Sequence, residues 1–427
     1  MCAQYRKGLW EGDAGAAACG STAPLLRDDP GMDASRPAVM GGHHIQPSAA
    51  GPCGFLSGQV LVPEGWVQGQ VRWEHSRVRA VQGTPMQQAQ RSEQAPPLIV
   101  PGFIDLHVHG GGGRDTMEGQ DAAQCLARTH ARHGTTALLA TTMTAPPHEI
   151  EAALRALAEP CARRPAQAAR LLGVHLEGPY ISPEQLGAQP PYAQSASLED
   201  ILRLNALAPI RVLTLAPEMP GNLALIPQLV AAGIRVQVGH TRASYEEVVQ
   251  ALAHGASGFT HLYNAMGALH HRAPGATGAA LAHAQHAEII PDLLHVHPGA
   301  IHAALRAVPG LFAVTDATAA AGMPDGPYPL GQHTVHKCMG GVRLADGTLA
   351  GSALTMDQAL RNLVHIGLSV EQASARVSTY AARYLGLSDR GLIAPGAWAD
   401  LVVLDPQTLQ VQQVVVEGEA IDLGTTA

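Results

Sequence analysis

The chain has 427 residues, of which 46% are hydrophobic and 15% charged, and its formal net charge is −8. This length exceeds one ordinary domain and suits a barrel of about 250 residues joined to a smaller domain. The negative balance, without any run of Lys or Arg, argues against a nucleic acid or an anionic membrane as a partner.

The sequence also predicts where the protein resides. No apolar run reaches the roughly 18 residues of a membrane span, and the N-terminus lacks the basic and apolar regions of a signal peptide. The six cysteines lie far apart without a C-x-x-C pair, which predicts reduced thiols rather than a disulfide framework. We therefore expect no membrane association and a cytoplasmic location.

The first segment of the chain, residues 1–53, is rich in Gly, Ala, Pro, Asp and Ser without a sustained period, which predicts a disordered extension. We expect order to begin at Phe55. Beyond it, Gln59–Val62 and Trp66–Trp73 alternate apolar and polar residues around Pro63-Glu64-Gly65, the pattern of two strands joined by a turn.

The end of the chain contains similar β-rich segments, Asp400–Leu404 and Val411–Val416. Strand patterns at both ends of a long α/β middle predict one small β-sandwich domain. Its two parts would be residues 54–97 and 393–427.

The middle of the chain, residues 98–392, alternates short apolar runs with helix-like stretches such as Ser244–His254. This alternation is typical of α/β proteins with a parallel sheet. Eight runs predict a (β/α)8 TIM-like barrel, whose catalytic residues would follow the carboxyl ends of its strands. The predicted strands are Ile104–Val108, Ala137–Thr141, Leu171–Leu176, Arg211–Leu215, Arg235–Val238, Gly258–His261, Glu288–Leu293 and Phe312–Thr315.

The first run ends in an H-x-H pair, His107 and His109. Residues two apart in a strand point to the same face, so both imidazoles should be directed at one place. The glycines at 110–113 would let the backbone pass close to a metal or a substrate. An isolated H-x-H is weak evidence, but its position after an apolar strand favours a metal site.

Four further polar residues end later runs: Glu177 the third, His240 the fifth, His261 the sixth and Asp316 the eighth. A buried carboxylate such as Glu177 needs a partner, and a metal ion would supply one. Either histidine alone could be an ordinary core residue, but the set together indicates a metal site. His175 shares the strand face of Glu177 one layer deeper, so we expect it to support the site or the core.

Imidazole and carboxylate ligands suit Zn²⁺ or Fe²⁺, and also Mn²⁺ or Co²⁺. An open coordination position would hold water and lower its pKa. Asp316 could accept the proton as general base and later return it to the leaving nitrogen as general acid. The residues thus predict a metal-dependent hydrolase with one or two divalent ions, and they leave the number and identity of the metals open.

These segments resemble the amidohydrolase superfamily and, within it, the N-acetylglucosamine-6-phosphate deacetylase family. The resemblance extends from about Phe55 to the C-terminus. It rests on PGFIDLHVHG (101–110), HLEGPYI (175–181), GHTRASYEE (239–247), THLYNAM (260–266), VTDATAAAG (314–322), GSALTMDQAL (351–360) and PGAWADLVVLD (395–405).

The resemblance implies an activity and a ligand set. Glu177, His240 and His261 would hold the main metal, and His107 and His109 a second one, with Glu177 shared between them. The expected reaction removes the acetyl group from N-acetyl-D-glucosamine 6-phosphate to give glucosamine 6-phosphate and acetate. Superfamily branches with a lysine bridge are disfavoured, because no lysine lies between Lys7 and Lys337.

By the same resemblance, Asn264 and Ala265 would contact the substrate phosphate, and Arg272 and His295 would complete its binding. Part of that binding site comes from a neighbouring subunit in the family, which implies a homodimer.

One segment departs from the family pattern. The family usually has G-A-H after the HLEGP motif, whereas this chain has Gly187-Ala188-Gln189. Ala188 and Gln189 are therefore expected at the substrate, but Gln carries no charge. The preferred sugar is left open.

Two other interpretations remain at this stage. The first is an amidohydrolase acting on another N-acyl sugar phosphate, such as N-acetylgalactosamine 6-phosphate, or on another amide. Substitution of Arg272 and His295 would distinguish a phosphorylated substrate from an unphosphorylated one. The second is a metal-binding or regulatory protein on a degenerate barrel, which Asp316→Asn would separate from an enzyme.

Overall fold

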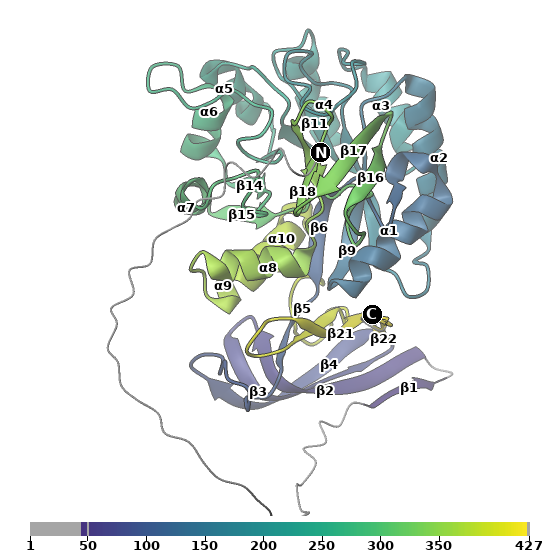
Figure 1. The fold of residues 1–427 in the computed structure, drawn as a ribbon, viewed down its shortest axis with the longest axis vertical. Coiled ribbons are helices and arrows are strands. Elements are labelled where there is room, and N and C mark those ends of the chain that lie inside the picture. Colours follow the sequence, from purple (N-terminus) through teal and green to yellow (C-terminus); the bar gives the residue numbers. More distant parts are fainter. Residues whose placement is uncertain (1–43, 49–50, 425–427) are drawn as a thin grey trace, which may run out of the picture. The chain divides into compact units, whose positions relative to one another are not determined.

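The computed structural model describes residues 44–48 and 51–424, and most of the extension expected at residues 1–53 lies outside these residues. The described chain forms a barrel of parallel strands surrounded by helices, together with a β domain (Figure 1). Both fold elements expected from the sequence are therefore present.

The barrel consists of eight parallel strands. Six are hydrogen-bonded in the order β6, β9, β10, β11, β12, β13, and β14 pairs with β15. Two backbone hydrogen bonds of 2.9 Å connect these groups, from Leu262 N to Glu288 O and from Asp316 N to His107 O. The (β/α)8 prediction is confirmed. The strands are β6 (Phe103–Val108), β9 (Thr135–Thr142), β10 (Arg170–Glu177), β11 (Ile210–Leu215), β12 (Arg235–Val238), β13 (Gly258–Phe259), β14 (His286–Ile289) and β15 (Gly310–Ala313).

Helices cover the outside of the barrel (Figure 1). In α5 (Tyr245–Ala253), predicted at Ser244–His254, the Ser244 side chain accepts from Glu247 N–H and Glu247 accepts from Ser244 N–H. This capping box fixes the start of the helix, and Val248 and Ala251 are buried. The other helices are α1 (Gln120–Arg132), α2 (Pro147–Ala162), α3 (Leu198–Asn205), α4 (Asn222–Ala231), α6 (Gly275–His283), α7 (Pro298–Ala307), α8 (Met356–His365), α9 (Val370–Ser374) and α10 (Tyr380–Leu385), with a 3-10 turn at Thr116–Glu118 and a π-helical turn at Ala375–Thr379.

Three barrel strands end earlier than predicted. β15 ends at Ala313 instead of Thr315. β13 stops at Phe259, because His261 has a φ of +29° and leaves the extended conformation. β14 covers His286–Ile289 instead of Glu288–Leu293. Pro291 has no N–H with which to continue the ladder, and Leu293 has a φ of +65°.

The β domain is one sheet in the order β22–β21–β20–β5–β2–β3–β4, with β1 paired to β2. Its core combines residues from both ends of the chain, such as Leu56, Trp73 and Val403. This confirms the domain expected from both chain ends. The strands are β1 (His44–Ser48), β2 (Gly51–Val62), β3 (Gly65–Glu74), β4 (Arg77–Met86), β5 (Leu98–Pro101), β20 (Leu401–Leu404), β21 (Val411–Val416) and β22 (Glu419–Ala420).

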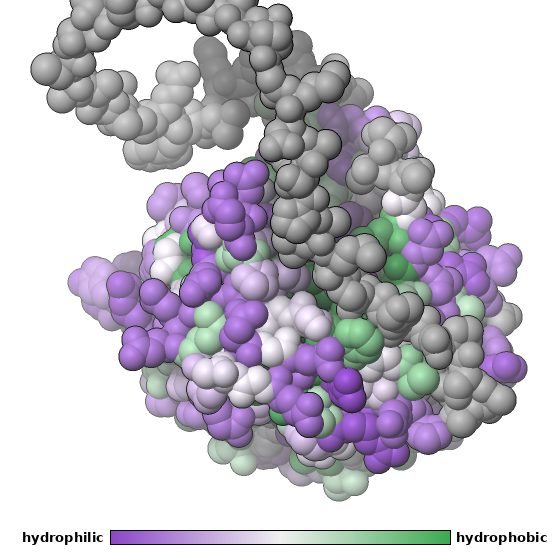
Figure 2. Space-filling view, turned by 90° about the horizontal axis from the view of Figure 1, so that it is seen from below, coloured by the Kyte–Doolittle hydropathy of each residue, from purple (hydrophilic) through white to green (hydrophobic). Residues whose placement is uncertain are grey.

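Described structure begins before Phe55, where order was expected to start. His44 pairs with Phe55 and Ser48 with Gly51, so β1 is an antiparallel neighbour of the first residues of β2. Backbone pairing of this kind needs no apolar alternation, which is why the composition of the segment did not predict it. On the side of this domain seen in Figure 2, hydrophilic residues are interspersed with small apolar areas.

A buried ion cluster links the β domain to the barrel. Glu417, directly after β21, pairs with Arg170 at the start of β10 (2.8 Å), with Arg164 (3.1 Å) and with Arg390 (2.5 Å). Arg390 also pairs with Asp400. These contacts bring the carboxyl-terminal segment of the chain against the amino-terminal end of a barrel strand.

A four-stranded antiparallel sheet between β15 and α8 was not predicted. It contains β16 (Gly326–Leu330), β17 (His333–Cys338), β18 (Gly341–Arg343) and β19 (Leu349–Ser352). Its apolar residues pack on Met143 and Ala320, near the carboxyl ends of the barrel strands. A short pair, β7 (Gly110–Gly111) and β8 (Arg114–Asp115), follows β6.

In the described part of the chain, none of the helices is both long and apolar enough to cross a membrane. Cys125 and Cys161 carry free thiols, as expected. Cys338 is disulfide-bonded, which differs from the expectation of reduced thiols throughout. Cysteine spacing along the sequence does not reveal which residues meet in space.

Candidate metal centre and substrate pocket

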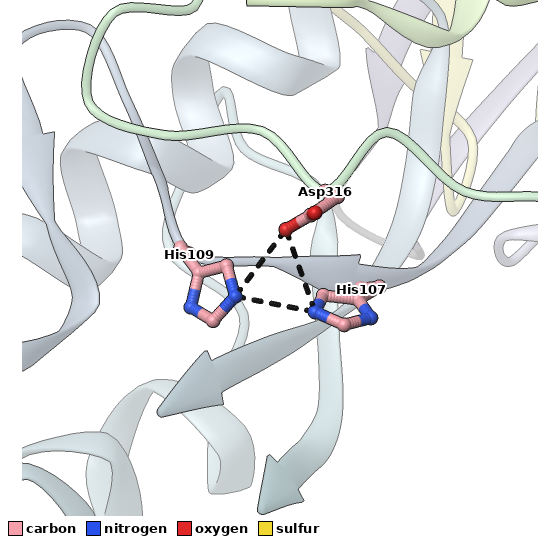
Figure 3. Close-up of side chains that lie close together, drawn as sticks. All are labelled: His107, His109 and Asp316. Carbon is pink, nitrogen blue, oxygen red and sulfur yellow. Dashed lines mark hydrogen bonds and ion pairs between the residues drawn. The ribbon is translucent and has the colours of Figure 1, made fainter. Parts of the chain in front are cut away.

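The H-x-H pair meets Asp316 at the mouth of the barrel. Figure 3 shows His107, on β6, and His109, directly after β6, both directed toward Asp316, which lies on the loop after β15. The Nε2 atoms of the two histidines are 3.2 Å apart. Asp316 Oδ1 lies 3.5 Å from Nε2 of His107 and 3.3 Å from Nε2 of His109. These three buried residues form one group that could hold a metal ion.

A second such group consists of Glu177, His240 and His261. Glu177 Oε1 lies 3.1 Å from His240 Nε2 and 3.0 Å from His261 Nε2. The other oxygen, Oε2, lies 3.1 Å from His109 Nε2. One carboxylate therefore contacts both groups, in the position of a shared ligand.

The hydrogen bonds behind the imidazoles test whether a metal fits here. Nδ1 of His107 faces Glu288 Oε2 at 3.0 Å, and Nδ1 of His240 faces the Gln185 carbonyl at 2.8 Å. A neutral imidazole donates from that nitrogen, so each Nε2 directs a lone pair at Glu177 and at another imidazole. Facing lone pairs repel unless a cation lies between them.

The spacing of the ligand atoms agrees with this interpretation. Metal–nitrogen bonds of 2.0–2.1 Å give a tetrahedron with edges of about 3.3 Å. The separations among Glu177, His240 and His261 are 3.0–3.1 Å, and those around His107, His109 and Asp316 are 3.2–3.5 Å. The donor set fits a divalent metal ion.

The pKa values show the same preference for positive charge. Burial disfavours the charged imidazoles, but Asp316 and Glu177 outweigh it and raise the pKa of His109 to about 9. They also hold the pKa of His107 well above its ordinary value. Burial alone would raise the pKa of Glu177, yet the facing histidines hold it well below the ordinary value.

Three of these residues have an unusual backbone conformation. The φ angles are +48° at His240, +29° at His261 and +49° at Asp316. Residues other than glycine rarely adopt this region, and functional sites are where such conformations concentrate. Each residue follows the end of its strand, where the turn aims the side chain across the barrel mouth.

Two buried residues support the groups from below. His175 has the supporting position expected for it, because its Nδ1 lies 3.0 Å from Leu106 O and its Nε2 lies 2.7 Å from Thr214 Oγ1. Burial lowers its pKa to about 4, which keeps it neutral. Glu288, which the sequence analysis missed, contacts His107, and no motif in the sequence marks it.

Above the metal groups lies a cavity of about 290 Å³, lined by Glu177, His240, His261, Asp316 and other residues. This is at the small end of ligand pockets, which run from about 300 to 1,000 Å³, and it suits a monosaccharide. Five of the predicted substrate contacts line it: Ala188, Gln189, Asn264, Ala265 and His295.

The predicted phosphate contacts differ in where the structure places them. The side chain of His295 is 7% exposed, and its Nδ1 lies 2.7 Å from Asp292 Oδ2. Burial opposes a charge on this imidazole, but Asp292 raises its pKa above the ordinary value and favours the imidazolium. Asn264 lies beside His261, whose carbonyl it contacts at 3.2 Å. Arg272 is exposed and is not among the described residues that line the cavity.

Gln189, the residue that departs from the G-A-H pattern, contacts a proposed metal ligand directly. Its Nε2 donates to Glu177 Oε2 at 2.5 Å, and its Oε1 accepts from Thr144 N at 2.6 Å. The side-chain amide of Gln189 therefore bridges the Glu177 carboxylate and the backbone N–H of Thr144 by two hydrogen bonds.

Other lining residues were not anticipated. Leu330, Thr348 and Leu349 come from the four-stranded insertion, Met143 follows β9, and Glu184 belongs to the loop after β10. None of them belongs to a motif that indicates chemistry, so the sequence contained no sign of their role.

The Amidohydrolase family matches residues 98–421. The N-acetylgalactosamine-6-phosphate deacetylase of Escherichia coli O157:H7 is 38% identical over 371 residues, which cover 84% of this chain and 97% of that protein. The N-acetylglucosamine-6-phosphate deacetylase of Lysinibacillus sphaericus is 39% identical over 325 residues, 74% of this chain and 84% of that protein.

A solved structure shows a similar fold with a sugar phosphate bound. It is a mutant of N-acetyl-D-glucosamine-6-phosphate deacetylase from Mycobacterium smegmatis in complex with N-acetyl-D-glucosamine 6-phosphate. It is 36% identical to this chain with a TM-score of 0.78, and the match covers 86% of this chain and 98% of that one.

Proposed function

Because this chain belongs to the amidohydrolase family, we propose that it removes the acetyl group from N-acetyl-D-glucosamine 6-phosphate. The products are glucosamine 6-phosphate and acetate, a step of amino-sugar breakdown. One observation carries the proposal: Glu177, His240 and His261 converge beside Asp316 at the floor of a cavity that also contains a largely buried, positively biased His295.

The residues divide the chemistry between them. A divalent metal held by Glu177, His240 and His261 would lower the pKa of a water molecule and polarise the amide carbonyl. Burial would raise the pKa of Asp316, but the nearby histidines hold it below its ordinary value, so the carboxylate is ionised and able to accept a proton. Asp316 takes that proton as the carbon–oxygen bond forms, and delivers it to the nitrogen as the carbon–nitrogen bond breaks.

We propose Zn²⁺ or Fe²⁺ as the metal, with one or two ions per subunit. The histidine and carboxylate donors also accept Mn²⁺ and Co²⁺. His107 and His109 supply the ligands of the second position, beside the shared Glu177.

The phosphate would bind at Asn264, the backbone of Ala265 and His295, all of which line the cavity. An imidazolium at His295 complements the charge of the phosphate. A phosphorylated sugar does not cross a membrane unaided, which supports a cytoplasmic reaction.

We propose that Arg272 completes phosphate binding in the pocket of a second subunit, in a homodimer. Its exposed position away from the cavity of its own chain supports this. Mixing Arg272→Ala subunits with Asp316→Asn subunits tests it, because a mixed dimer rebuilds one complete site. Recovery of activity above both parents is expected, and no recovery in a demonstrated mixed dimer would contradict the proposal.

N-acetylgalactosamine 6-phosphate is a second candidate substrate. The Escherichia coli relative named for that sugar matches over nearly its whole length. Gln189 also distinguishes this chain from the G-A-H pattern at a position in the cavity. The two sugars differ only in the configuration of one hydroxyl group, so a direct comparison of rates decides between them.

The decisive experiment measures acetate release from both sugar phosphates and from unphosphorylated N-acetylglucosamine, with elemental analysis of the same protein. We expect turnover of the glucosamine derivative to be fastest and that of the unphosphorylated sugar to be weakest. A metal-loaded protein that hydrolyses none of the three would contradict the proposal and favour a non-enzymatic metal-binding protein.

A further inference from the structure

Glu288 lies at the end of β14 with its side chain fully buried behind the metal groups. Its Oε2 lies 3.0 Å from His107 Nδ1 and accepts a hydrogen bond of 3.2 Å from the backbone N–H of His261. The same oxygen atom therefore contacts one residue of each metal group.

The contact with His107 sets the direction of that imidazole. When Nδ1 donates to the carboxylate, the lone pair of Nε2 points to the metal position beside His109. The carboxylate also makes the imidazole a stronger donor. Nδ1 of His109 and of His261 has no hydrogen-bond partner in the described structure, and Nδ1 of His240 faces a carbonyl. Of these four imidazoles, His107 alone is oriented by a carboxylate.

The rest of the Glu288 carboxylate is poorly compensated. Its Oε1 has no hydrogen-bond partner among the described residues, and His175 Nδ1 lies 3.8 Å away. A buried carboxylate with an unsatisfied oxygen is costly unless positive charge lies near. A cation on the far side of the His107 ring would supply that charge.

We propose that Glu288 is a positioning residue that holds His107 for a second metal ion and, through the same oxygen, fixes the backbone of His261 at the first. The chain then binds two ions, with Glu177 between them. This inference rests on the proposed function as a metal-dependent hydrolase, and it assigns to Glu288 a role in the occupancy of the second position.

The test measures metal binding, not turnover. Metal-free protein is titrated with Zn²⁺ in competition with a chromophoric chelator, and the ions retained per chain are counted by elemental analysis. We expect two ions in the unmodified chain. Glu288→Gln keeps the volume and an oxygen acceptor but loses the charge. It should lower the affinity for the second ion about 10-fold while the first ion stays bound. Glu288→Leu removes the acceptor and should lower the affinity for the second ion about 100-fold.

A matched control is Asp357→Asn. Asp357 is also a buried carboxylate paired with a histidine, since its Oδ1 lies 3.4 Å from His133 Nδ1, but it does not contact the metal groups. This variant should lower the melting temperature without changing the number of ions bound. Glu288→Asp serves if the other variants fail to fold, because it retains the charge and withdraws the oxygen from His107.

The proposal is overturned if the unmodified chain binds a single ion, if the Glu288 variants bind two ions with unchanged affinity, or if Asp357→Asn loses the second ion equally. Failure of the proposed function is recognised separately. A chain that binds two ions, loses the second in Glu288→Gln and hydrolyses no sugar phosphate would retain the positioning role while contradicting the deacetylase activity.

Discussion

Replacing Asp316 by Asn removes the proposed proton carrier while leaving its surroundings in place. The backbone of this residue is held by hydrogen bonds from Asp316 N to His107 O (2.9 Å) and from Ser352 N to Asp316 O (2.7 Å). Neither involves the side chain, and Asn has nearly the same shape. The Glu177, His240 and His261 group does not depend on Asp316, so its metal should remain bound.

The size of the effect follows from the two tasks assigned to one carboxylate. General acid–base catalysis contributes about 10²- to 10⁴-fold, or roughly 3–5 kcal/mol of transition-state stabilisation. Asn can neither accept the proton nor return it to the leaving nitrogen. We expect the substitution to lower kcat for N-acetylglucosamine 6-phosphate by about 10²- to 10⁴-fold, with little change in KM.

Acetate release, elemental analysis and circular dichroism on one preparation measure this effect. Asp422→Asn provides a control, because Asp422 is an exposed carboxylate that accepts from Gly424 N far along the chain from the site. A kcat within tenfold of the unmodified enzyme, at equal metal content, would refute the assignment of Asp316 as the proton carrier.

Three further predictions concern binding, metal retention and stability. Because Asp292 overcomes burial and raises the pKa of His295, KM for a sugar phosphate should be low below that raised pKa and increase as the pH passes above it. His295→Ala should raise this KM about 10- to 100-fold and abolish its pH dependence, as steady-state kinetics will show, without affecting an unphosphorylated substrate. Gln189→Leu removes the 2.5 Å hydrogen bond to Glu177, so the protein should lose metal to a chelator about tenfold more readily, and unchanged retention would argue against this contact. Burial would raise the pKa of Glu417, but Arg170 and Arg390 hold it at about 2 against an ordinary 4.5, so the stability from this group is complete above pH 4.5 and is lost as the pH falls toward 2. Urea midpoints measured across this pH range should fall less steeply for Glu417→Gln.

Local pattern was sufficient to predict the barrel and the residues that converge at its mouth, where they could hold a metal ion. Most of the predicted barrel strands contain an apolar run, and a polar residue at or just after the end of such a run stands out in the sequence. Parallel strands gather their carboxyl ends on one face. The sequence alone therefore predicts that these residues lie together: His107, Glu177, His240, His261 and Asp316.

The four-stranded insertion could not be predicted in the same way. Its strands bury few side chains, with Leu330 in β16 and Val335 in β17 as the only fully buried residues of those two described strands. Period-2 alternation is weak when most positions are half-exposed. The sequence therefore gave no indication that Thr348 and Leu349 line the cavity.

Glu288 was missed because of a shift in one strand. The apolar run at 288–293 predicted a strand in which Glu288 came first, and the first residue of a barrel strand lies far from the catalytic face. The structure ends β14 at Ile289, where Pro291 interrupts the ladder. Glu288 is therefore near the carboxyl end of its strand, at the level of the metal ligands. A shift of four residues at one strand end thus decides whether this carboxylate is a distant residue or a neighbour of His107.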